Sequence, residues 1–195
     1  NLVAVLGIVT AVGSMISMAL CPLLIKKLNE RNAYILLSVY GFAASVFSFV
    51  IGHFWFQSPK NMVLTVLFYA SLFLIGLQFG AVTLMPMIMT ADTVDYYEHE
   101  TGKRMEGACY SILTLTIKVC LALGTAVGLI FVQKSGYYES LSAGTFTTKT
   151  KDIIFFAYTA LPGILALLSI VPMFKYDIVG EKKAKISSDL ASRRK

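Results

Sequence analysis

The chain has 195 residues, of which 56% are hydrophobic and 14% charged, and its formal net charge is +6. Soluble domains carry about 25% charged residues, so this composition and a mean hydropathy of +0.71 exclude an ordinary soluble globular protein. Five long apolar segments account for the difference. Each exceeds the roughly 18–20 residues that a helix needs to cross the hydrocarbon core of a bilayer. In chain order they are residues 1–25, 33–56, 62–89, 108–132 and 153–174.

These segments predict an all-α fold, a polytopic membrane bundle of five transmembrane helices within residues 1–179. The strands of a membrane barrel would alternate polar and apolar residues, and the five segments do not. Residues 180–195 are charged and serine-rich, a composition that predicts a disordered cytoplasmic tail. We expect the sequence to be truncated, because it opens inside an apolar run with neither an initiating Met nor a basic region before it.

The links between the segments differ in charge. Links 26–32 and 90–107 and the tail after residue 174 together hold twelve Lys and Arg residues, whereas links 57–61 and 133–152 hold four. Cytoplasmic links of membrane proteins are enriched in Lys and Arg. We therefore expect a multi-pass protein of the plasma (inner) membrane, with Asn1 outside and Lys195 in the cytoplasm. Topology and contact with anionic lipid account for the net charge, so no nucleic-acid partner is expected.

Glycine and proline recur inside the segments. Gly76/Gly80 and Gly124/Gly128 have the small-xxx-small spacing that lets helix backbones approach closely. They predict helix packing more readily than a hinge. Pro162-Gly163 in the last segment is the better candidate for a kink.

Lys118 is the only ionisable side chain deep inside any of the five segments. A charge at that depth costs at least about 2.5–3.5 kcal/mol, so we expect it to face protein or a water-filled cavity. Snorkelling to the interface is the alternative. With 100° per residue, small and hydroxyl-bearing side chains share its helix face. They are Gly107, Ser111, Thr114, Ala122 and Thr125.

A second and weaker polar stripe is formed by Ser71 and Gln78 in the third segment. An interhelical hydrogen bond and a substrate contact explain it equally well. No Asp or Glu lies in any of the five segments. Because a buried ammonium needs acceptors or a carboxylate to remain charged, Lys118 either loses its proton or pairs with protein outside this sequence.

Residues 91–107, ADTVDYYEHETGKRMEG, are expected to form a charged cytoplasmic loop. A solvated loop is the simplest interpretation. A metal site is a second, but the spacing of Asp95, Glu98, His99 and Glu100 matches no specific ligand pattern. A set of interhelical ion pairs that closes the cytoplasmic end is the third.

The same loop carries a recognisable motif. It reads AD-x-VDY-x-E-x-x-TG-x-R-x-EG, and Tyr110-Ser111 and then Lys118 follow it. This arrangement resembles the glycoside–pentoside–hexuronide cation symporters, the melibiose-permease relatives of the major facilitator superfamily. The match runs from about residue 86 to residue 118. Elsewhere the resemblance is one of topology, together with the basic link KKLNERN at residues 26–32.

The resemblance implies that the five segments are helices eight to twelve of a twelve-helix transporter. The N-terminal half, which supplies most of the cation-binding carboxylates in that family, and helix seven would then be missing partners. Lys118 matches the family's intramembrane lysine at the cation and sugar site, and Thr114 matches a sugar-lining position. A set of charged residues matches the cytoplasmic gate: Asp92, Asp95, Glu98 and Arg104.

The leading functional prediction is secondary active transport of a sugar, a glycoside, pentoside or hexuronide, coupled to Na⁺ or H⁺. The residues expected to line the coupling site are Lys118, Thr114, Ser111, Thr125 and Gln78. Leu113 and Thr83 replace contacts that are often polar and aromatic in close relatives, which leaves the sugar unspecified. No enzyme and no cofactor beyond the coupling cation are expected. The alternatives are another major facilitator-type transporter, a structural or pore-forming membrane subunit, and a retinal protein with Lys118 as Schiff base, against which the five segments argue.

Overall fold

The computed structural model describes residues 2–58 and 60–193, and all regular elements in these residues are helices. Four stretches are long and apolar enough to cross a membrane: Gly7–Gln57, Met62–Thr101, Glu106–Lys134 and Thr148–Met173. The first stretch is long enough for two crossings, since it has 51 residues. The predicted all-α polytopic bundle is therefore confirmed.

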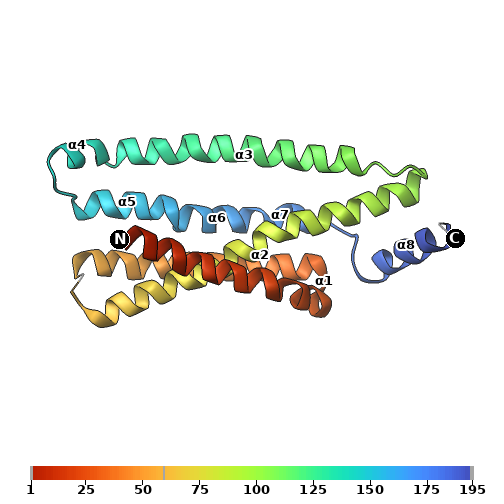
Figure 1. Cartoon of the computed structure of the whole chain (residues 1–195), viewed down its shortest axis with the longest axis horizontal. Coiled ribbons are helices and arrows are strands. Elements are labelled where there is room, and N and C mark those ends of the chain that lie inside the picture. Colours follow the sequence, from red (N-terminus) through yellow and green to blue (C-terminus); the bar gives the residue numbers. More distant parts are fainter. Residues whose placement is uncertain (1, 59, 194–195) are drawn as a thin grey trace.

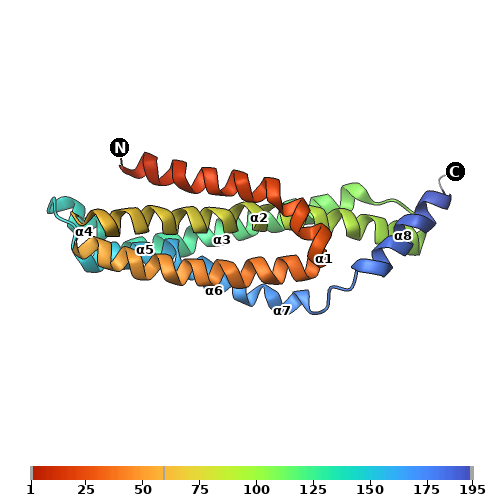
Figure 2. The ribbon, with the colours of Figure 1, turned by 90° about the horizontal axis from the view of Figure 1, so that it is seen from below.

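Helix α1 (Leu2–Gln57) contains the first two predicted spans. At Asn29 the backbone leaves the helical region, with φ 63° and ψ 162°. Asn tolerates positive φ better than most residues do. The chain reverses there, and Figure 2 shows the two arms of α1 running in opposite directions.

Helix α2 (Met62–Thr101) runs well past the predicted end of the third span. Asn61 begins it by accepting hydrogen bonds from the backbone N–H groups of Val63 and Leu64. Gly102 ends it in the left-handed conformation, with φ 70°. The expectation of a loop beginning at residue 90 was therefore wrong. Acidic residues mark the edge of the membrane, but they do not end a helix, and no Gly or Pro interrupts residues 90–101.

The first arm of α1 packs tightly on α2 through glycines. A Cβ atom added to Gly13 would lie 2.6 Å from the carbonyl oxygen of Phe73. Cβ atoms at Gly76 and Gly80 would collide with the carbonyl oxygens of Thr10 and Ser14. The Gly76/Gly80 pair therefore serves helix packing, as its spacing predicts.

Helix α3 (Glu106–Lys134) lies along one side of the molecule (Figure 1), and none of its residues is buried. The short helix α4 (Tyr137–Ser142) follows in the link to the last span. Thr150 ties that link together, because its hydroxyl donates to the carbonyl of Ser135 at 2.9 Å and lies 3.3 Å from the hydroxyl of Ser140.

The last span consists of three helices: α5 (Thr148–Tyr158), α6 (Ala160–Leu168) and α7 (Ile170–Met173). A proline cannot donate to the carbonyl four residues earlier and its ring crowds that carbonyl. Pro162 and Pro172 lie four residues after Tyr158 and Leu168, the last residues of α5 and α6. The break predicted at Pro162-Gly163 therefore falls one turn earlier.

Residues Gly180–Arg193 form helix α8. This differs from the disordered tail that the composition predicts. Ile186 and Leu190 on one face of α8 are buried together with Ile178, against Tyr96 and Tyr176. The overall polarity of the tail conceals this apolar stripe, whose spacing of four residues is that of a helix.

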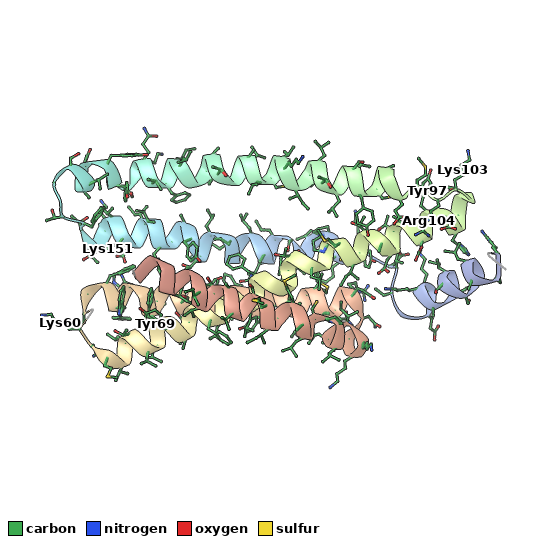
Figure 3. All side chains as sticks on the ribbon, viewed as in Figure 1. Lys60, Tyr69, Tyr97, Lys103, Arg104 and Lys151 are labelled. Atoms are coloured by element: carbon green, nitrogen blue, oxygen red, sulfur yellow. The ribbon has the colours of Figure 1, made fainter. Side chains whose placement is uncertain are left out.

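The ends of the bundle separate the links as predicted. Lys60 and Lys151 lie at one end, and Lys103 and Arg104 lie at the other, beside α8 (Figure 3). We expect a cysteine introduced at the exposed Ser142 to react with an impermeant thiol reagent only from outside the cell. A cysteine at Ser188, exposed on α8, is the matched control and should react only from the cytoplasm. Reaction of the residue-142 cysteine from the cytoplasm alone would reverse the topology.

Candidate functional site

The polar face of α3 is a shallow groove. Its open volume is about 400 Å³, and its lining residues are Gly107, Tyr110, Ser111, Thr114, Leu115 and Lys118. Thr114 donates its hydroxyl proton to the carbonyl of Tyr110 at 2.8 Å, so its remaining lone pairs are free to accept. The structure thus places the predicted Ser111, Thr114 and Lys118 together on one surface. Thr125 is exposed further along α3 and bonds the carbonyl of Leu121.

This groove faces away from the rest of the chain. The side of α3 turned toward α2 carries Cys109, Ile112, Leu113 and Thr116, which line a separate cavity with Thr90 and Thr93. Lys118 is two residues from Thr116, and such residues point about 200° apart on a helix. In residues 2–58 and 60–193, no ion pair or hydrogen bond joins the Lys118 ammonium to another side chain. The polar face is therefore uncovered in the described structure.

Gln78 does not belong to the groove. It is buried, and its side chain fills the space over Gly41, in the interface between α1 and α2. Ser71, in the same stripe, shares a hydrogen bond with Ser48 at 2.9 Å. The structure thus supports the interhelical interpretation of this stripe and leaves Gln78 away from Lys118.

Just before α3 begins, and three residues from Gly107 in the groove, Arg104 gathers acidic side chains. Its guanidinium lies 2.9 Å from Glu98 and 3.5 Å from Asp95, and 3.2 Å from Glu106. Asp95 and Glu98 are three residues apart on α2 and so share one face. Hydrogen bonds to Glu106 and Glu98 raise the pKa of Arg104 above its ordinary value. Three of the four predicted gate residues are therefore in mutual contact.

The fourth predicted gate residue, Asp92, has different partners. It pairs with Lys183 of α8, whose ammonium also contacts Glu30 in the turn of α1. Sequence patterns gave no reason to select Lys183, because Glu30 is 153 residues away from it. Two features of the sequence could have indicated this contact. They are the apolar stripe of residues 186 and 190 and a single acid in the otherwise basic link 26–32.

The family model for MFS/sugar transport proteins matches residues 1–180 of the chain. The chain belongs to this family. The membership confirms the resemblance to the sugar transport proteins of the major facilitator superfamily, and the long apolar helices agree with a multi-pass membrane protein.

Several curated proteins are similar to this chain. The "Glucuronide carrier protein homolog" of Escherichia coli K12 is 25% identical over 187 residues, which cover 94% of this chain and 38% of the relative. The "Inner membrane symporter YicJ" of the same organism is 31% identical over 65% of this chain and 27% of its own length. The "Uncharacterized 29.9 kDa protein in crtE 3'region" of Pseudescherichia vulneris is 28% identical over 76% of this chain and 53% of its own length.

The chain therefore spans between about a quarter and a half of the length of these relatives. No solved structure shows significant similarity to it.

The acidic segment offers no metal centre among the residues that the structure describes, since no three His, Cys, Asp or Glu side chains there could hold one ion. Asp95 and Glu98 face Arg104, whereas His99 lies 3.1 Å from Asp189 of α8. The acidic side chains of this family member instead form ion pairs.

Proposed function

We propose that the chain forms the C-terminal part of a transporter that moves a glycoside, pentoside or hexuronide together with Na⁺ or H⁺. One observation carries this proposal. At membrane depth, α3 bears an open polar groove that ends at Lys118 near the middle of the helix and is turned away from the other spans. A polar groove of this kind is unfavourable against lipid.

A second set of membrane helices would cover this face. In secondary transporters, substrate and cation sites lie near the bilayer midplane between two structural halves. The relatives are longer than this chain, and their names include a glucuronide carrier homolog and a symporter. Lys118 would then pair with a carboxylate from the covering helices, while Ser111 and Thr114 bond sugar hydroxyls.

The ion pairs at the start of α3 fit a cytoplasmic gate. Arg104 joins the end of α2 to the start of α3 through Glu98 and Glu106. Arg104 and Glu106 are exposed, whereas Glu98 is partly buried. Ion pairs of an exposed guanidinium contribute only about 0–1 kcal/mol. A contribution of that size biases a conformational equilibrium without fixing it.

Uptake by the complete protein tests the proposal. Cells or proteoliposomes containing it would be offered a glucuronide, a pentoside and a disaccharide glycoside, each with a Na⁺ gradient, a proton gradient or neither. We expect at least one sugar to accumulate against its gradient, and only when one of the cation gradients is present. Sugar entry that merely equilibrates, with no effect of either gradient, would favour a pore-forming subunit instead.

We expect Arg104→Ala in the complete protein to slow transport by up to about fivefold, the factor that 1 kcal/mol represents, without lowering the amount inserted. Lys103→Ala is the matched control, since Lys103 is a neighbouring exposed cation with no acidic side-chain partner among the described residues. Initial uptake rates, normalised to protein in the membrane, give the comparison. Equal rates in both variants would remove Arg104 from the gate.

A further inference from the structure

Helix α8 docks on the cytoplasmic end of α2 through both apolar and polar contacts. Ile186 and Leu190 are buried at 6% and 4% exposure against Tyr96 and Tyr176. At the end of α8, Asp189 lies 3.1 Å from His99, and Arg193 donates to the carbonyl of His99 at 3.0 Å. These contacts hold the helix in one place beside the acidic segment.

Lys183 is the central polar contact of this docking. Its Nζ lies 2.6 Å from Glu30 Oε1, 2.7 Å from Asp92 Oδ1 and 2.8 Å from Asp92 Oδ2. The side chains of Glu30 and Asp92 are only 7% and 9% exposed. Tyr176 adds a longer hydrogen bond to Asp92 at 3.4 Å. One ammonium thus joins three parts of the chain: the turn of α1, the end of α2 and α8.

The electrostatics make this ammonium necessary to the arrangement. Two nearly buried carboxylates that share one site repel each other and are poorly solvated. Partial burial alone would lower the pKa of Lys183, but its hydrogen bonds to Asp92 and Glu30 outweigh burial and raise that pKa above its ordinary value. Lys183 is therefore charged at neutral pH and compensates both acids.

The Lys183 contact also separates two acidic groups on one helix. Asp92 and Asp95 are three residues apart on α2, yet Asp92 pairs with Lys183 and Asp95 with Arg104. A small cavity of about 70 Å³ lies beside both aspartates, and Asp92, Asp95 and Lys183 are among its lining residues. If α8 undocked, Asp92 would lose its cation while Arg104 remained close by.

We propose that Lys183 is a positioning residue of the cytoplasmic gate: by joining Glu30 and Asp92 it holds the α1 turn to α2 and keeps Asp92 apart from the Arg104 cluster. Helix α8 is thereby a component of the gate, and its release favours opening toward the cytoplasm. This inference rests on the proposed transport function. Its docking step, however, is measurable without transport.

Docking is tested by a cysteine at Leu190, which is shielded when α8 is docked. The complete protein, with its other cysteines replaced, is labelled in inside-out vesicles by an impermeant maleimide. We expect Lys183→Gln to raise the labelling rate of the residue-190 cysteine about tenfold, less than for a fully buried pair because Lys183 is 36% exposed. Lys183→Arg, which keeps the charge, should restore most of the protection. Lys185→Gln removes an exposed lysine of the same helix and should change nothing.

The gate role is tested by a cysteine at Thr114, in the α3 groove, labelled from each side of the membrane. With Lys183→Gln we expect labelling from the cytoplasm to rise and labelling from outside to fall; with Lys185→Gln both should stay at the parent values. Unchanged labelling at residue 190 would overturn the Lys183 contact. A change at residue 190 with none at residue 114 would leave Lys183 as a mere anchor of α8 and overturn its gate role. If the residue-114 cysteine of the parent reacts from neither side, the proposed cavity is absent and the gate role fails with it, while residue 190 still decides the docking.

Discussion

Replacing Lys118 by Leu should abolish concentrative sugar uptake by the complete protein while leaving its membrane insertion intact. Removing an ammonium from the middle of a membrane helix favours insertion by about 3–4 kcal/mol, so lost uptake cannot be attributed to failed insertion. Uptake should fall to background because, among the described residues that line the groove, Lys118 alone carries a charge that could link the sugar to the cation. Accumulation against a gradient, with protein quantified by immunoblot, is the measurement.

Two companion variants sharpen the result. Lys118→Arg should restore little activity, because a planar guanidinium does not replace a compact ammonium in a fitted cavity. Leu123→Ala removes bulk from a different, exposed face of the same helix and should leave accumulation near the parent value. Parent-level accumulation in Lys118→Leu would make Lys118 a snorkelling residue and remove it from the site.

Gly80→Ala should destabilise this chain strongly. The new methyl group would meet the backbone carbonyl of Ser14, which cannot move without shifting the first arm of α1. Overpacking of a tight contact costs about 1–3 kcal/mol. The thermal midpoint of the purified chain in detergent should therefore fall by several degrees, since about 2–4 °C accompanies each kcal/mol in a chain of this size.

Gly128→Ala is the matched control for Gly80→Ala. Both glycines belong to small-xxx-small pairs in membrane helices, but a Cβ atom at Gly128 would meet nothing within 4 Å in the described structure. Alanine also has the higher helix propensity, so the midpoint should stay the same or rise slightly. If the two substitutions lower the midpoint equally, the close approach of α1 and α2 at Gly80 is incorrect.

The comparison of these two glycine pairs illustrates what sequence could and could not provide. Hydropathy predicted the apolar stretches that the structure folds into long helices, because their length and apolarity are set by the bilayer itself. The identical spacing of Gly76/Gly80 and Gly124/Gly128, however, does not distinguish a packed pair from an unpartnered one. That difference depends on which helices become neighbours, and spacing within one helix carries no such information.

The end of the bundle that carries α8 shows a second limit. The family resemblance selected Asp95, Glu98 and Arg104, and the structure brings them together because they are close in sequence, at the end of α2 and just after it. Asp92 was selected with them, but its cation comes from Lys183, 91 residues later. The charged composition of the tail concealed the stripe that docks α8. Long-range ion pairs of this kind are invisible to local periodicity.

Labelling of a cysteine at Thr114 in the complete protein tests most directly whether the α3 groove lines a sugar pathway. Leu123→Cys, on the opposite face of the same helix, is the control. The proposal predicts that a water-soluble thiol reagent modifies the residue-114 cysteine, that a transported sugar with its coupling cation slows this reaction severalfold, and that the residue-123 cysteine shows no such protection. A residue-114 cysteine that is inert to the reagent, or that reacts equally fast with and without sugar, would contradict it.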